Sequence, residues 1–161
     1  MSTLSVDTIQ GQTTAANVKL PAGTPVQVVS GAPSSGVSFD TSTGTEYTIM
    51  TLNITPKYNT SKILVLCNIG MYMNSSTNQV RGDFQIRRNT TLIRGTASGG
   101  TGYFRDSSGS FKSIMSNFNH LDSPATTSQI TYKMAWRGET HAVGGQFHEN
   151  YTNMTLMEIA Q

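Results

Sequence analysis

The stretch from Lys62 to Met73 constrains the fold more than any other part of the sequence. Side chains alternate between two faces along a β-strand, and in this stretch both faces are apolar. One face carries Ile63, Val65, Cys67, Ile69 and Met71, and the other carries Leu64, Leu66 and Tyr72. A strand with two apolar faces must be covered twice, so this segment is expected to be buried from both sides.

Other short segments with strand character follow one another at a spacing of roughly ten residues. They are bounded by Gly, Pro, Ser or Asn, and no window sustains helical periodicity. The predicted strands are 26–29, 47–54, 62–73, 80–88, 91–94, 111–118, 128–137, 140–148 and 154–159, with a hairpin turn at Asn89-Thr90. Strands of this length and spacing predict an all-β sandwich or barrel.

Two further predicted strands are apolar on both faces. Met154 and Leu156 oppose Met157 and Ile159, while Ile49 opposes its neighbour Met50. A lone two-layer sandwich covers each sheet on one face only, so the second cover must come from another subunit. We therefore predict an oligomer whose interface includes Leu64, Leu66, Tyr72, Met157 and Ile159.

The chain is expected to divide into an extended N-terminal anchor, residues 1–24, and a β-sandwich head, residues 25–161. In the anchor, apolar residues at 4, 6 and 9 alternate as in a strand, but residues 11–16 contribute nothing to a compact core. Such a segment becomes ordered only against a partner. The predicted anchor residues are Leu4, Val6, Ile9, Val18 and Leu20.

Charge is the anomaly in the composition. Asp, Glu, Lys and Arg make up 12% of the residues, about half of the usual fraction. The net charge of +2 is spread without a basic cluster, so a nucleic-acid partner is not expected. No apolar run reaches membrane-spanning length, and the N-terminus has no secretory signal pattern. The single cysteine, Cys67, excludes an internal disulfide and is predicted to be a small core residue.

The motifs that could indicate chemistry are weak. The cell-attachment tripeptide Arg81-Gly-Asp83 leads into a predicted strand and does not lie at the tip of a loop. The glycine-rich stretch 95–102 lacks the Lys-Ser/Thr ending and the following helix of a phosphate-binding loop. His120, His141 and His148 are too separated for a zinc pattern, and no nucleophile–base setting is visible. We expect no catalytic, metal-binding or cofactor-binding residues, and hence a protein that is not an enzyme.

Aromatic residues give the remaining candidates for ligand contact. Tyr103, Phe104 and Arg105 are predicted to lie in a long Gly/Ser-rich loop, 95–109, where apolar rings are costly to expose without a use. The alternative is that these residues fold back over a sheet edge. Trp136 shares a predicted strand face with Ile130, Tyr132 and Met134, which predicts a core position.

Several short segments occur in a characteristic order: Asn53-Ile-Thr-Pro56, Ser61-Lys-Ile-Leu-Val65, Phe84-Gln-Ile-Arg87, Leu92-Ile-Arg-Gly95, 121–128, Thr131-Tyr-Lys133 and Met157-Glu-Ile159. In this order and spacing they resemble a module found in structural proteins of marine tailed bacteriophages. The opening segment 2–10, together with 13–15 and 18–23, is similar to the N-termini of phage fibres. The folded part also resembles the jelly-roll head of tumour-necrosis-factor-like and complement-type trimers.

This resemblance implies a trimeric jelly-roll β-sandwich that is held on the virion through its N-terminal segment, on a particle assembled in the host cytoplasm. The implied function is a short fibre or capsid decoration, with host-surface attachment as one role. The alternative is a carbohydrate-binding module of a tail fibre that recognises a host-surface glycan. A glycan-cleaving spike would need a pair of carboxylates in a groove; Glu139 and Glu149 are the candidates, and nothing in the sequence places them together.

Overall fold

The computed structural model describes residues 20–40, 44–74, 79–95, 102–105, 111–140 and 144–161. Within these residues the chain is all-β apart from one short 3-10 helix. The elements are β1 (Pro25–Gly31), β2 (Val37–Asp40), β3 (Glu46–Ile54), β4 (Lys62–Asn74), β5 (Gln79–Arg88), β6 (Thr91–Arg94), β7 (Gly102–Arg105), β8 (Phe111–Asp122), β9 (Ile130–Thr140), β10 (Gly144–Phe147), η1 (Glu149–Tyr151) and β11 (Asn153–Ile159).

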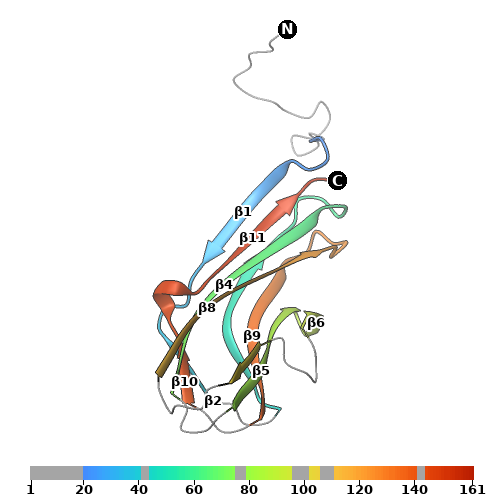
Figure 1. Ribbon diagram of the computed structural model, residues 1–161. Coiled ribbons are helices and arrows are strands. Elements are labelled where there is room, and N and C mark those ends of the chain that lie inside the picture. Colours follow the sequence, from blue (N-terminus) through green and yellow to red (C-terminus); the bar gives the residue numbers. More distant parts are fainter. Residues whose placement is uncertain (1–19, 41–43, 75–78, 96–101, 106–110, 141–143) are drawn as a thin grey trace.

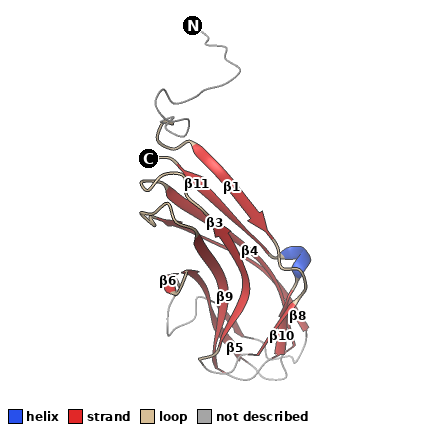
Figure 2. Cartoon of the chain, turned by 180° about the vertical axis from the view of Figure 1, so that it is seen from behind, coloured by secondary structure: helices blue, strands red, loops and turns tan. Residues whose placement is uncertain are grey.

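The strands form two antiparallel sheets, which lie face to face as a β-sandwich (Figures 1 and 2). In the six-stranded sheet A, the long strand β4 pairs with β8 along one edge and with β11 and β10 along the other. Strand β1 pairs with β11, and β2 pairs with β10. The five-stranded sheet B has the order β3-β9-β5-β6, with β7 also paired to β5. The sandwich predicted from strand spacing is therefore confirmed.

The core lies between the two sheets. Its centre is Trp136 on β9, which is fully buried and packs edge-on against Phe84 of β5, with ring centroids 4.9 Å apart. Cys67 on β4 is also buried, and this burial raises the pKa of its thiol to about 12. The core assignments of Trp136 and Cys67 are thus confirmed, and a thiol that stays protonated at neutral pH is inert as a nucleophile.

Glycine at position 82 is required by the packing of this core. A Cβ atom there would stand 2.0 Å from Cζ2 of Trp136, far inside van der Waals contact. The same position is the centre of the Arg81-Gly-Asp83 tripeptide. Gly82 lies within β5 and Asp83 is only 1% exposed, so the tripeptide is part of a packed sheet and not an accessible attachment loop.

The alternation predicted for β3 is wrong at one point. Ile49 was expected on the face opposite to Met50, but both side chains are buried in the core. The reason is a β-bulge, seen as a register shift between Thr48 and Met50 in the pairing of β3 with β9. A bulge adds one residue to a strand and so resets the alternation.

The segment 95–109 was predicted to be one long loop, and this is also wrong in part. Tyr103, Phe104 and Arg105 lie in strand β7, which pairs with Gln79–Arg81 of β5. Tyrosine and phenylalanine favour strands, and β6 is only four residues long, so part of the β5 edge is left for β7 to pair with. These residues therefore extend the edge of sheet B.

Candidate functional site

The outer face of sheet A is the candidate site, because the residues predicted to form an oligomer interface come together on it. Leu64, Leu66 and Tyr72 alternate along β4 with the buried core residues of that strand. Met157 and Ile159 do the same on the neighbouring strand β11, where Met154 and Leu156 point inward. All five predicted residues are therefore on one face of one sheet, and each is only partly buried within a single chain.

A row of apolar side chains crosses this face in register. Val28 of β1 pairs with Met157 of β11, Met157 pairs with Leu64 of β4, and Leu64 pairs with Leu121 of β8. Val28 is 55% exposed and Leu121 is 48% exposed. Directly opposed side chains on one sheet face lie about 5 Å apart, so the four residues form a continuous apolar strip. Sequence patterning predicted the two central members; it did not find Val28 and Leu121, because pairing decides which residues join the strip.

The remainder of the face is polar and carries little charge. Asn68 of β4 donates a hydrogen bond of 2.9 Å to Oδ1 of Asn153 on β11, and the hydroxyls of Ser30 and Thr155 are 2.9 Å apart. Lys62 is the first residue of β4. Among the side chains that the structure describes in β1, β4, β8 and β11, it is the only charged one on this face. Depletion of charge is the compositional signal that separates the cores of protein interfaces from ordinary surface.

Aromatic rings mark the end of this face near the 3-10 helix. Tyr151, which is 59% exposed, packs edge-on with His148 at 6.2 Å, and His148 packs against Tyr72 at 6.1 Å. Gly70 of β4 lies beneath Tyr151, and a Cβ atom at this glycine would stand 2.3 Å from Cβ of Tyr151. Gly70 thus allows the tyrosine to lie close against the sheet and extends the apolar surface beyond Leu66.

The outer face of sheet B has the opposite character. Glu46 of β3 accepts a hydrogen bond of 2.8 Å from Nε of Arg87 on β5, and it also pairs with Lys133 of β9. Partial burial of Glu46 opposes its ionisation, but the hydrogen bonds and positive charges of Lys133 and Arg87 outweigh that effect and lower its pKa. Charge is therefore concentrated on the outer face of sheet B, whereas Lys62 is the one charge found on the described part of the sheet A face.

A second polar cluster connects the two sheets at one edge. Asp122, at the end of β8, accepts hydrogen bonds from Arg88 of β5 at 3.0 Å and from the hydroxyl of Tyr132 on β9 at 2.7 Å. Burial of Tyr132 and its hydrogen bond to Asp122 raise the pKa of the phenol. This cluster fixes the position of β8, which forms one edge of the candidate face.

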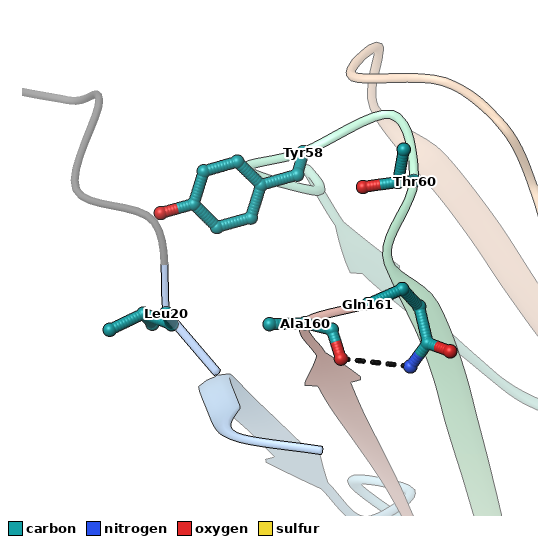
Figure 3. Close-up of a pocket in the computed structure, with 5 residues that line it drawn as sticks. All are labelled: Leu20, Tyr58, Thr60, Ala160 and Gln161. Carbon is teal, nitrogen blue, oxygen red and sulfur yellow. Dashed lines mark hydrogen bonds between the residues drawn. The ribbon is translucent and has the colours of Figure 1, made fainter. Parts of the chain in front are cut away.

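The sequence-predicted anchor is represented in the structure by Leu20 alone, since residues 4, 6, 9 and 18 lie outside the described residues. Leu20 lines a pocket of about 160 Å³ together with Tyr58, Thr60, Ala160 and Gln161 (Figure 3). Backbone hydrogen bonds tie the following residues to the C-terminal strand: Gly23 donates to Ala160 at 2.8 Å, and Ala160 donates to Thr24 at 2.9 Å. The chain therefore enters the sandwich beside its C-terminus (Figure 1).

A smaller pocket of about 130 Å³ opens between the sheets, next to β6 and β8. It is lined by Phe84, Arg94, Gly95, Ser116, Asn117 and Phe118. The rings of Phe84 and Phe118 stack with their centroids 5.6 Å apart and form its apolar wall. Arg94 is exposed, and its guanidinium has no acidic partner among the described residues.

Nothing in the described residues forms a metal site, since no three His, Cys, Asp or Glu side chains gather there. Glu149 lies in the 3-10 helix η1 and Glu139 in β9, so the two carboxylates weighed for glycan cleavage belong to different elements. No described helix is long and apolar enough to cross a membrane.

No family model matches this chain, and no curated protein sequence matches it. Among solved structures, it is similar to the particle of infectious bursal disease virus, with a TM-score of 0.48 and 12% identity over 86% of this chain and 36% of that chain. The structure of the Gt strain of the same virus has a TM-score of 0.49 and 12% identity, covering 87% of this chain and 38% of that chain. The VP2 subviral particle of infectious bursal disease virus has a TM-score of 0.46 and 15% identity, over 86% and 38%.

The present chain spans little more than a third of the length of these structures. With TM-scores below 0.5, the likeness is partial, and it assigns neither family nor function to the chain.

Proposed function

We propose that this chain is a non-enzymatic structural protein of a bacteriophage virion, a short trimeric fibre or decoration whose β-sandwich head assembles through the outer face of sheet A. The observation that carries this proposal is the charge-poor face itself, with Val28, Met157, Leu64 and Leu121 in one apolar row. Exposed apolar area of this kind on a soluble domain marks an interaction surface. The order of the phage-like sequence segments supports the virion as the location of this protein.

The strand order supports a jelly-roll winding of the head. Strands β3, β4 and β5 follow one another in the chain but alternate between the sheets, as do β8, β9 and β10. In sheet A, β1 pairs with β11, β11 pairs with β4, and β4 pairs with β8 on its other edge, while β10 and β2 complete the sheet beside β4; sheet B has the order β3-β9-β5-β6. Two sheets filled in alternation by successive strands are the pattern of a jelly roll. A three-fold arrangement would place the sheet A faces around a common axis, with the charged faces of sheet B outside.

Sedimentation equilibrium of the purified full chain tests the assembly. We expect a species near three times 17.4 kDa at micromolar concentration. Leu66→Asp should dissociate it, because an unpaired charge buried at an interface costs about 3–5 kcal/mol. Ile159→Lys should act in the same way. Thr51→Asp is the matched control, since Thr51 is exposed on the other sheet. A folded wild-type monomer under these conditions would overturn the proposal.

The anchoring role of residues 1–24 belongs to the same proposal. Removing residues 1–19 should leave the head folded and trimeric, and should abolish its incorporation into particles during infection. Mass spectrometry of purified virions, with the full chain as a positive control, gives the readout. Retention of the truncated chain on the particle would show that the head itself carries the docking contacts.

Glycan recognition is the second candidate function, and the pocket beside Arg94 favours it. A guanidinium that has no acidic partner among the described residues, set next to stacked rings, offers a bidentate contact for a carboxylate and an apolar wall for a sugar ring. Binding to a glycan array, lost in Arg94→Gln, would support this function. The sequence also predicts Tyr103, Phe104 and Arg105 as ligand contacts. Replacing these three residues with alanine tests that prediction on the same glycan array. If the wild-type head binds no glycan on the array, glycan recognition is ruled out and the structural role is the one that remains.

A further inference from the structure

Strand β8 forms one edge of sheet A, and it is unusually regular for an edge strand. It is 12 residues long, and every residue from Phe111 to Asp122 pairs with β4 without a register shift. No described residue pairs with its other edge. An unpaired edge presents a row of free backbone N–H and C=O groups, which is a template for another strand.

The direction of these backbone groups follows from the contacts of Gly70 on β4. The Gly70 carbonyl accepts a bond of 2.9 Å from the N–H of His148, and its N–H bonds to the Thr152 hydroxyl at 3.2 Å. Gly70 therefore directs both groups away from β8. Backbone direction alternates along a strand, so Ile69 and the other odd-numbered residues of β4 bond to β8.

The unbroken register carries this alternation onto β8. Ile69 pairs with Ser116, so the even-numbered residues of β8 bond to β4. The odd-numbered residues then direct their N–H and C=O groups to the free edge. These outward residues are Ser113, Met115, Asn117, Asn119 and Leu121, and their side chains are exposed on the outer face of sheet A.

The other edge strands carry features that discourage pairing. Strand β1 begins with Pro25 and has a register shift at that end, and β3 contains the bulge between Thr48 and Met50. Strands β2, β6 and β7 have four residues each. Proline, bulges and short length are the usual protections of sheet edges. Among the described edge strands, β8 alone is long, evenly paired and free of all three.

We propose that β8 pairs antiparallel with β8 of a second copy of this chain, about a two-fold axis through Asn117. In this register Asn117 stands opposite itself, Met115 stands opposite Asn119, and Ser113 stands opposite Leu121. Five outward residues in each strand then form about ten backbone hydrogen bonds. The edge pairing uses backbone groups in the plane of sheet A, whereas the proposed trimer uses side chains on the outer face of that sheet. The two contacts are therefore compatible.

The sequence of β8 fits a copy of itself. From Ser113 to Leu121 the strand has no acidic or cationic residue other than the titratable His120, so antiparallel self-pairing places no like charges opposite each other. The side-chain amide of Asn117 has both donors and an acceptor, so two copies can bond each other across the axis. Met115 and Leu121, 70% and 48% exposed, become diagonal neighbours across the new pair.

Cysteine cross-linking of the full chain tests the register. Asn117→Cys should form a disulfide-linked dimer under mild oxidation, since paired residues have Cα atoms about 5.5 Å apart, within disulfide range. Met115→Cys and Asn119→Cys should not cross-link alone, but a mixture of the two should. Cys67 is buried and does not compete. No dimer with Asn117→Cys, or equal dimer formation by all three variants, would overturn the proposal.

Proline gives an independent test that separates this inference from the proposed trimer. Asn117→Pro removes an outward N–H and no bond to β4, so the head should stay folded and trimeric while larger assemblies disappear in sedimentation velocity runs. Asn117→Thr, which keeps the N–H, is the control and should retain the larger assemblies. If the trimer is absent but the edge pairing correct, the wild type will give dimers that proline abolishes. A wild type that stops at the trimer at all concentrations would refute the edge pairing only.

Discussion

Arg88 donates hydrogen bonds to both carboxylate oxygens of Asp122, at 3.0 and 3.1 Å, and so links β5 of sheet B to β8 of sheet A. The same carboxylate accepts the hydroxyl of Tyr132 from β9. Asp122 is only 6% exposed. It belongs to β8 and is bonded to β5 and β9, so the cluster joins three strands from both sheets. These hydrogen bonds hold β8 against the body of the sandwich.

Asp122→Asn is expected to destabilise the head by about 1.5–3 kcal/mol, the range for a hydrogen bond to a charged group. The substitution keeps the shape of the side chain but removes the charge that faces Arg88. Urea unfolding followed by circular dichroism gives the free energy of unfolding. Lys57→Gln, at an exposed position, is the control and should change it by less than about 0.5 kcal/mol. An equally small effect of Asp122→Asn would show that the pair contributes nothing net.

The Glu46 cluster predicts a pH dependence of stability. The pKa of Glu46 is lowered in the folded state from its ordinary value of 4.5. A depressed carboxyl pKa stabilises the fold above the unfolded-state pKa, and this contribution is lost as the pH falls through the folded-state pKa. Glu46→Gln should therefore lower the free energy of unfolding at neutral pH and have little effect at about pH 2. A difference that is the same at both pH values would contradict this account.

Gly82→Ala should be among the most damaging small substitutions in the chain. The added methyl group would stand 2.0 Å from the Trp136 ring, and overpacking of this kind costs about 1–3 kcal/mol or more. Gly31→Ala is the matched control, because its new Cβ meets the Leu52 side-chain end at 3.3 Å, and that end can move. Differential scanning calorimetry should show a much lower melting temperature for Gly82→Ala and a nearly unchanged one for Gly31→Ala.

Two truncations test the proposed boundary between an N-terminal anchor and the β-sandwich head. Removing residues 1–19 should leave the melting temperature nearly unchanged. Removing residues 1–24 deletes the backbone bonds that Gly23 and Thr24 make to Ala160, with an expected cost of about 1–3 kcal/mol. Equal stability of the two truncated chains would place the start of the head after Thr24, as the sequence boundary at residue 25 predicts.

The residues that share the outer face of sheet A could be predicted from the sequence because β4 runs without a bulge. Its period of two is preserved from Lys62 onward, so Leu64 and Leu66 fall on one face by counting alone. The same counting failed on β3, where the bulge at Thr48 and Met50 resets the face of Ile49. A bulge has no unique sequence mark, and it becomes visible only through the partner strand.

Long-range polar contacts could not be predicted in this way. Arg88 and Asp122 are 34 residues apart, and neither lies in a distinctive motif. Glu158 is fully buried on β11, where it accepts hydrogen bonds from the backbone N–H of Lys57 at 2.7 Å and from the side-chain amide of Gln27. Sequence patterning treats such a residue as a solvent-facing charge, because the donors that permit its burial come from distant strands.

The position of Trp136 gives the head an intrinsic optical reporter. The chain has one tryptophan, and that indole is fully buried beside Phe84 and Phe147. An indole in an apolar environment emits at shorter wavelength than one in water, so opening of the sandwich will shift the emission to the red. Melting of the purified protein and of its edge variants can thus be followed from one native chromophore, without attaching a dye to the outer face of sheet A or to the β8 edge.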